Sequence, residues 1–168
     1  MLNKFLLINW ILFILFSTGF FVKSDEMIIE IDNPRFSEKG LNDKIYEIKA
    51  KKGLKSDSNL ELFVIEGKFK TEEDGKWIYL EADEGNFSQV NDFIVLKNNI
   101  VFYTDGGEKF KSDKATFDMN NDIIKLNENV SHENTNGLIH ADSSVISENF
   151  NNIEYTGNVS SILKNLNK

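Results

Sequence analysis

The chain of 168 residues leaves room for one domain of about 100–150 residues once a targeting segment is set aside. It contains no cysteine, which excludes disulfide bonds, thiolate metal sites and a cysteine nucleophile. The formal net charge of −8 argues against nucleic acid as a partner, because a phosphate backbone binds to basic surfaces. Because the chain is acidic, an anionic lipid would have to be held mainly by burial of its acyl chains.

The first predicted element is an uncharged apolar segment that runs from Phe5 to Val22. At a rise of about 1.5 Å per residue, it reaches the lower limit for a helix that spans a membrane. Lys4 precedes the segment and acidic residues follow it, so its N-terminal end should stay in the cytoplasm. We therefore expect a transmembrane anchor at residues 1–23 and a single domain at residues 24–168 on the far side of the membrane.

A cleaved signal peptide is the alternative for this segment, with Ser17 and Gly19 as the small residues before a possible cleavage site. The apolar run continues beyond that site from Phe20 to Val22, which favours an uncleaved anchor. Because no cysteine follows the segment, a lipoprotein anchor is not expected.

After the anchor, the sequence has the pattern of an antiparallel β protein. Short runs of β-branched and aromatic residues recur, such as 77–80, 93–96 and 100–103. Turn-forming clusters such as Asp105-Gly106-Gly107 and Asn136-Gly137 separate the runs, and Asn-Gly is a strong hairpin signal. We predict an all-β domain in which neighbouring strands pair in chain order.

The most informative feature is an internal repeat, whose three units align without gaps from Leu80, Phe110 and Ile139. The same place in each unit, about 30 residues apart, is taken by Asp83, Asp113 and Asp142. An earlier unit, from Ile48, fits the same frame if one extra residue is allowed. Each unit supplies a strand, a turn and a second strand, and we predict a sheet system of roughly a dozen strands whose apolar faces are covered by neighbouring units.

Alternation of apolar and polar residues assigns the two faces of these strands. On the apolar face we place the residues that we expect to contact acyl chains: Ile48, Ala50, Leu80, Ala82, Ile94, Leu96, Phe102, Phe110, Leu126, Ile139, Ala141 and Tyr155. The opposite face should lie in water and carries Glu81, Asp83, Lys97, Lys111, Asp113, Lys125, Asp142 and Glu154. A filled hydrophobic core is the alternative for the apolar face. Small residues at matching points, namely Ala50, Ala82, Ser112 and Ala141, favour an interior that is open to acyl chains.

Several segments occur in a recognisable order: the N-terminal span, Asn33-Pro34-Arg35-Phe36, Tyr46-Glu47-Ile48-Lys49-Ala50, the apolar-x-Ala/Ser-Asp units at 80–83, 110–113 and 139–142, and the closing Tyr155-Thr156-Gly157-Asn158-Val159. In this order the chain resembles the lipopolysaccharide-export family of membrane-anchored periplasmic proteins, the C component of the Lpt bridge across the envelope. The resemblance implies a curved antiparallel β-jellyroll of repeated strand pairs. It also implies a single-pass protein of the cell inner membrane, with its C-terminal domain in the periplasm.

The same resemblance implies the partners. Members of this family receive lipopolysaccharide from the subunits of an inner-membrane ABC transporter and pass it to a soluble periplasmic bridge protein by edge-to-edge strand pairing. By position, the transporter would meet Met27, Ile29 and Ile31, and the bridge protein would meet Tyr155, Gly157, Val159 and Ser161. The alternative within transport is the soluble bridge protein itself, which shares the repeat but is released by signal cleavage.

An enzyme acting on glycans is the alternative from another class, with Asp83, Asp113 and Asp142 as catalytic carboxylates. Their equivalence in the repeat argues against it, because an acid/base pair needs environments that separate its pKa values. The histidines, His132 and His140, are expected at the surface, with no third ligand nearby to complete a metal site. We therefore expect no catalytic residue, no metal site and no cofactor.

Overall fold

A computed structural model describes residues 27–39, 45–56, 59–70, 75–88, 93–118, 121 and 123–164. These residues form one antiparallel sheet of 11 strands. In chain order the strands are β1 (Ile29–Asp32), β2 (Arg35–Lys39), β3 (Ile45–Lys55), β4 (Asn59–Lys70), β5 (Trp77–Ser88), β6 (Phe93–Thr104), β7 (Lys109–Asp118), β8 (Ile123–Glu133), β9 (Gly137–Ser147), β10 (Asn152–Thr156) and β11 (Ser160–Leu163). A short 3₁₀ helix, η2 (Glu148–Phe150), lies between β9 and β10. The predicted all-β, antiparallel class is confirmed.

The anchor expected at residues 1–23 lies outside the described residues. Within the part of the chain that the structure describes, no helix is both long enough and apolar enough to cross a membrane. The described strands all belong to a single sheet, which extends through most of the domain expected at residues 24–168.

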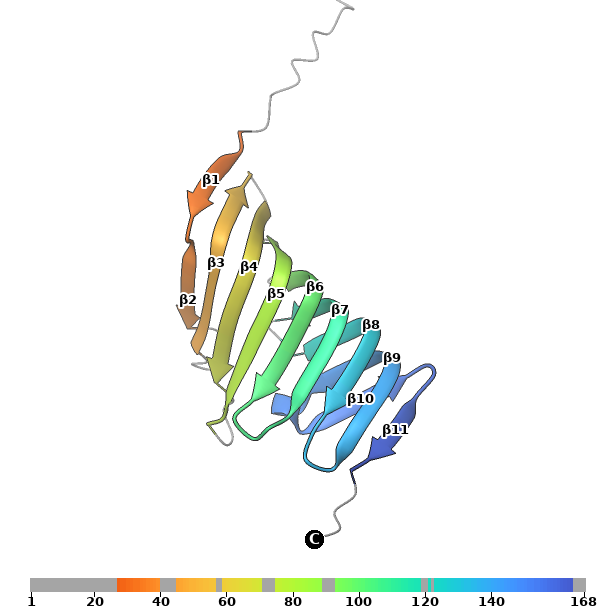
Figure 1. Cartoon of the computed structure of the whole chain (residues 1–168). Helices are drawn as coiled ribbons and strands as arrows, with labels where there is room; N and C mark the ends of the chain where they lie inside the picture. Colours follow the sequence, from red (N-terminus) through yellow and green to blue (C-terminus); the bar gives the residue numbers. More distant parts are fainter. Residues whose placement is uncertain are drawn as a thin grey trace, which may run out of the picture.

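The strands from β3 to β9 each pair with the next along the chain, as the turn-rich sequence predicts (Figure 1). At one end of the sheet, β1 and β2 both pair with β3, along different parts of its length. At the other end, β10 and β11 share β9 in the same way. Each edge of the sheet therefore consists of two short strands. They are separated at Asn33-Pro34 on the N-terminal edge and at residues 157–159 on the C-terminal edge.

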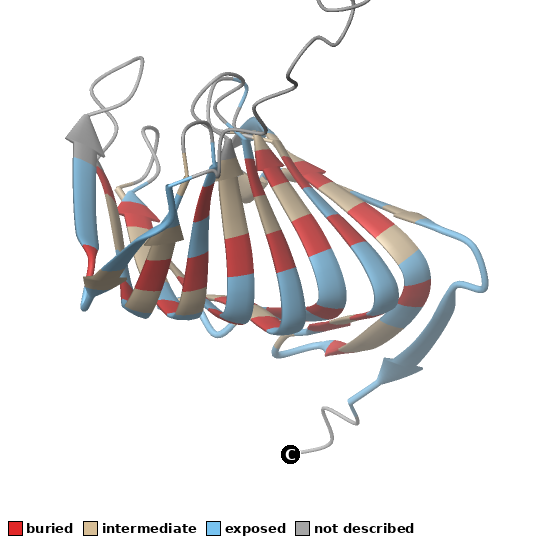
Figure 2. Ribbon diagram, turned by 90° about the horizontal axis from the view of Figure 1, so that it is seen from above, coloured by how far each residue is buried: buried red, intermediate tan, exposed pale blue. Residues whose placement is uncertain are grey.

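The long strands bend near their middle, where the ladder register shifts. In β6 and β8 the bend contains Asn98-Asn99 and Glu128-Asn129, whose φ angles are 63° and 50°, and 65° and 54°. Such paired left-handed residues turn a strand sharply without ending it. Figure 2 shows the strands curving round at these bends, so that the two halves of the sheet face each other.

Apolar side chains fill the space between the two halves. The largest fully buried ones are Phe102, Phe110, Ile78, Leu96, Ile100, Ile124, Leu126, Ile146 and Val130. Burial of one such side chain contributes about 1.5–3 kcal/mol, so this interior is the main source of stability. The predicted alternation is confirmed on the other face, because the eight polar residues assigned to water are all exposed.

Candidate binding interior and sheet edges

The residues expected to contact acyl chains line one interior. Ala50, Leu80, Ala82, Ile94, Leu96, Phe102, Phe110, Leu126 and Ala141 are buried, whereas Ile48, Ile139 and Tyr155 are partly exposed. Ile48 belongs to β3 near the N-terminal edge, and Ile139 and Tyr155 belong to β9 and β10 near the C-terminal edge. The interior therefore extends from one edge of the sheet to the other.

The centre of this interior is filled by aromatic rings of the chain itself. Phe69 stacks on Phe117 with ring centroids 5.1 Å apart, and Tyr46 lies 5.9 Å from each of them. Tyr46 and Phe69 are cross-strand partners in one half of the sheet, and Phe117 belongs to the other, so the three rings close the space that the sequence predicts to be open. Among the small residues that suggested an opening, Ala82, Ser112 and Ala141 are buried beside the register shifts of their strands.

Sequence reasoning missed Phe150, which completes this closure. The residue lies in η2, and its ring centroid is 6.2 Å from that of Phe69 and 5.9 Å from that of Phe110. Its φ angle of 70° is unusual for an aromatic residue, so packing of the ring must offset backbone strain. The repeat contained a signal for this residue, because Phe150 stands where the two earlier units have an asparagine, Asn91 and Asn121.

Free space inside the fold lies toward the N-terminal edge. A crevice of about 70 Å³ is lined there by Phe36, Tyr46, Ile48, Leu60, Leu62, Phe87 and Ile94. Phe36 is 38% exposed, so this apolar space opens at the edge strand β2. The crevice is large enough for part of one acyl chain and marks where the interior can be entered.

The C-terminal end of the interior is more polar than the alternation predicted. His132 is buried, its Nδ1 shares a hydrogen bond with the hydroxyl of Tyr155, and its ring stacks on Phe110 with centroids 4.0 Å apart. Burial lowers the pKa of His132 and raises the pKa of Tyr155 to about 12, so both groups are neutral near pH 7. Among the described residues, His132 Nε2 and Ser144 Oγ have no hydrogen-bond partner. The expectation of a surface position is wrong for His132, whereas His140 is exposed.

The three repeated aspartates have a structural partner. Asp83, Asp113 and Asp142 accept hydrogen bonds from Asn99, Asn129 and Asn158 at 2.7, 2.5 and 2.9 Å, each across a separation of 16 residues. Each asparagine lies at a bend, and each pair ties a bend to the neighbouring strand. These carboxylates are exposed and equivalent, so their common role is to hold the bends. The described residues contain no group of three or more side chains that could hold a metal ion.

The N-terminal edge exposes the residues expected to meet a transporter. Met27 is 71% exposed and Ile29 is 47% exposed, while Ile31 is partly buried against the interior. β1 pairs with β3 from Ile29↔Lys55 to Asp32↔Lys52. On its other side, β1 meets no strand among the described residues, so that side can accept another strand.

The C-terminal edge brings together only some of the residues expected to meet a bridge protein. Val159 is 54% exposed and Ser161 lies in the exposed strand β11, whereas the side chain of Tyr155 turns inward to His132. Gly157 forms the bend between β10 and β11 with a φ angle of 71°, and its carbonyl accepts a hydrogen bond from the backbone N–H of Asp142 at 3.0 Å. A side chain at this position would collide with Asp142, which explains the glycine.

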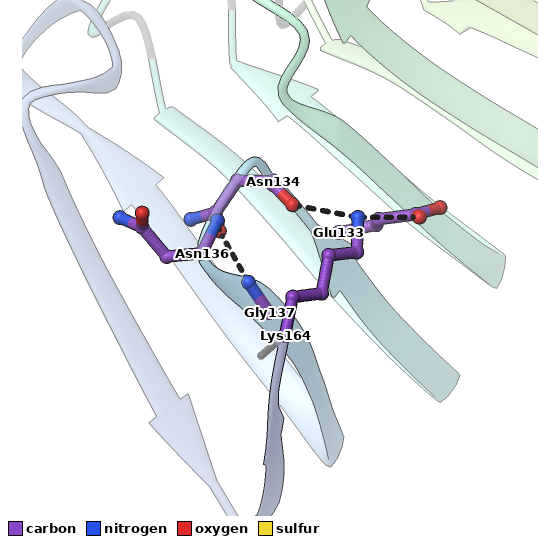
Figure 3. Close-up of polar contacts among 5 residues, drawn as sticks. All are labelled: Glu133, Asn134, Asn136, Gly137 and Lys164. Atoms are coloured by element: carbon purple, nitrogen blue, oxygen red, sulfur yellow. Dashed lines mark hydrogen bonds and ion pairs between the residues drawn. The ribbon is translucent and has the colours of Figure 1, made fainter. Parts of the chain in front are cut away.

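A cluster of polar contacts holds β11 at this edge (Figure 3). The ammonium of Lys164 donates to Glu133 Oε1 at 3.0 Å and to the carbonyl of Asn134 at 2.9 Å. The same hydrogen bond from Lys164 lowers the pKa of the Glu133 carboxyl. The side chain of Asn134 in turn accepts from the N–H groups of Asn136 and Gly137. The last described strand is therefore fastened to the β8–β9 turn.

The arrangement defines a class of protein: an antiparallel β-sheet folded around an aromatic-rich interior, with an unpaired edge at either end. No protein-family model matches the chain, and no curated protein matches it in sequence.

Proposed function

We propose that this chain is a membrane-anchored periplasmic component of lipopolysaccharide transport. Its β-jellyroll receives lipopolysaccharide from an inner-membrane ABC transporter, holds the acyl chains between the two halves of the sheet, and passes the lipid to a soluble bridge protein. The observation that carries the proposal is a continuous, largely apolar interior that reaches from one unpaired edge of the sheet to the other. The process makes and breaks no covalent bond.

Burial of acyl chains supplies the driving force in this proposal. Each buried methylene contributes about 0.8 kcal/mol, so even a few carbons offset an unfavourable electrostatic contact with an acidic protein. The crevice beside Phe36 is the point of entry, because it is apolar and opens at β2. Further entry requires Phe69 and Phe117 to separate, and Phe150 to leave its place against Phe69 and Phe110.

The two edges set the direction in which the lipid is transferred. β1 pairs with a strand of the transporter, and β10 and β11 pair with a strand of the bridge protein, so that the interiors of the partners become continuous. The apolar segment at residues 1–23 keeps the domain at the membrane where lipid is collected. If the protein were instead the soluble bridge protein, mass spectrometry of the mature chain would find a new N-terminus near Phe20.

Native mass spectrometry of the full-length protein, purified from a cell that makes lipopolysaccharide, tests this proposal. The wild-type protein should carry a lipopolysaccharide adduct. Ile139→Asp should lose the adduct, because it places a carboxylate at a partly exposed position of the interior. His140→Asp is the matched control, since it places the same charge on the next residue of β9, which is exposed. An adduct that is absent from wild type, or equally retained by both variants, contradicts the proposal.

A further inference from the structure

A wide concavity of the described surface lies on the outer face of the sheet, on the side opposite the apolar interior. It is a trough of about 690 Å³ that crosses the strands from β2 to β6. This volume falls within the range of about 300–1,000 Å³ that small-molecule sites occupy. Acyl burial in the interior does not involve this face.

Two aromatic rings form one wall of the trough. Tyr79 of β5 and Tyr103 of β6 are direct cross-strand neighbours, and their rings stack with centroids 5.0 Å apart and an interplanar angle of 15°. The hydroxyl of Tyr103 donates to Glu81 Oε1 at 3.3 Å, which fixes the orientation of the ring pair. A rigid, half-exposed aromatic wall presents apolar ring faces and polar hydroxyls to the same ligand.

The charges along the trough are balanced. Its cationic side chains are Arg35, Lys49 and Lys68, and its carboxylates are Glu47, Glu66 and Glu81. Most of them are already paired, since Lys49 lies 2.6 Å from Glu66 and Lys68 lies 2.9 Å from Glu47. A trough without net charge does not select an ion. It offers hydrogen-bond donors and acceptors in alternation beside aromatic faces, which suits a molecule rich in hydroxyl groups.

The trough and the apolar crevice meet at the N-terminal edge. Phe36 and Ile48 border both spaces, so the two lie on opposite faces of the sheet at β2. One amphiphile can therefore place a hydroxyl-rich head group in the trough and an acyl chain in the crevice, passing around the edge strand. Neither space alone provides for both parts of such a molecule.

We propose that the outer trough between β2 and β6 binds the saccharide part of a glycolipid, with Tyr79 and Tyr103 stacking against a sugar ring. The proposal rests on the proposed function for the identity of the lipid, but the trough binds its saccharide independently of acyl burial. The saccharide would then be held at the edge where the lipid enters, while the acyl chains pass into the interior.

Isothermal titration of the full-length protein with deacylated lipopolysaccharide oligosaccharide tests this site, in a detergent whose head group is not a sugar. Wild type should bind, and Tyr79→Ala/Tyr103→Ala should raise the Kd roughly tenfold through loss of aromatic contact. Tyr79→Phe/Tyr103→Phe keeps the rings and should stay near wild type. Ser37→Trp fills the trough from its other wall without touching the tyrosines and should also abolish binding.

Phe93→Ala is the matched control, because Phe93 is an exposed aromatic residue that does not line the trough, and its Kd should be unchanged. Absence of oligosaccharide binding to wild type, equal affinity in all variants, or equal binding of inorganic phosphate would overturn the proposal. The intact lipopolysaccharide adduct separates the two proposals. If the adduct forms but the oligosaccharide does not bind, only the trough proposal fails; if the oligosaccharide binds and no adduct forms, only acyl burial fails.

Discussion

At the residue scale, three aspartate–asparagine pairs explain the strongest signal in the sequence. The repeat located Asp83, Asp113 and Asp142, and the outer position of each followed from alternation. Their function in the fold did not follow, because a hydrogen bond between a strand and a bend depends on how the chain folds back. The partner asparagines occupy equivalent places in the same gap-free alignment, so the pairing could have been found by asking which polar residues recur with the aspartates.

The Asp113–Asn129 pair predicts a modest effect on stability. Asp113→Ala should lower the free energy of unfolding by about 0.5–1 kcal/mol, because it removes one exposed hydrogen bond that holds a bend. Urea unfolding followed by circular dichroism measures this change. Lys125→Ala, another exposed outer-face substitution, should stay within about 0.5 kcal/mol of wild type. Equal unfolding curves for the two variants would refute the role given to Asp113.

His132 illustrates where residue-level prediction failed. The side chain has the same alternation parity as Val130, which points inward, but its polarity suggested a surface position. The structure buries it because the imidazole is neutral, stacks on Phe110 and shares a hydrogen bond with Tyr155. A neutral, hydrogen-bonded histidine is far less costly to bury than a charged one.

The lowered pKa of His132 predicts a pH dependence of stability. The unfolded chain, with an ordinary histidine pKa of about 6.5, takes up a proton at higher pH than the folded chain does. His132 contributes its full share of stability above the pKa of the unfolded chain, and this contribution is lost as the pH falls toward the pKa of the folded chain. Thermal unfolding should show wild type losing more stability between about pH 7.5 and pH 5.5 than His132→Phe. The same loss in both proteins would show that His132 does not titrate as the fold requires.

At the scale of elements, strand identity and order were predictable because turn clusters and period-two alternation are local signals. The bends were not, since Asn98-Asn99 and Glu128-Asn129 continue the strand in sequence while changing its direction in space. The placement of η2 was also hidden, because the repeat singles out Phe150 but does not indicate what its ring will contact. Strand direction and interior closure are tertiary properties that the pattern of one strand does not contain.

The C-terminal edge gives a prediction at this scale. The N–H of Lys164 bonds to the carbonyl of Asn136, so alternation directs the N–H groups of Ile162 and Ser160 toward β9 and that of Ser161 toward the open side. Ser161→Pro should therefore weaken binding to the proposed bridge protein, because it removes an outward donor without breaking the pairing with β9.

Surface plasmon resonance with the purified bridge protein measures this effect, and Ser161→Ala, which retains the N–H, should bind like wild type. Ser160→Pro should instead disturb the pairing of β11 with β9. Unchanged affinity of the Ser161→Pro variant would mean that β11 is not the strand that the partner extends.

At the scale of the whole molecule, the fold joins two properties that the sequence predicted separately. One is an apolar face shared by all repeat units, and the other is an unpaired strand at each end. The sheet folds over on itself, so the apolar faces meet and the ends of the interior coincide with the edges. Prediction from sequence reached the faces through alternation, whereas the edges were assigned only by the family resemblance. It did not reach the closed centre or the outer trough, because these depend on curvature.

The central claim is that acyl chains occupy the space between the two halves of the sheet. Site-specific photo-crosslinking of the full-length protein in cells tests it most directly, with the crosslinker placed at Phe87 or Ile139 in the interior and at Lys111 or Lys125 on the outer face. Lipopolysaccharide adducts are expected from the two interior positions and none from the two outer positions. Equal capture at all four positions, or capture only on the outer face, would contradict it.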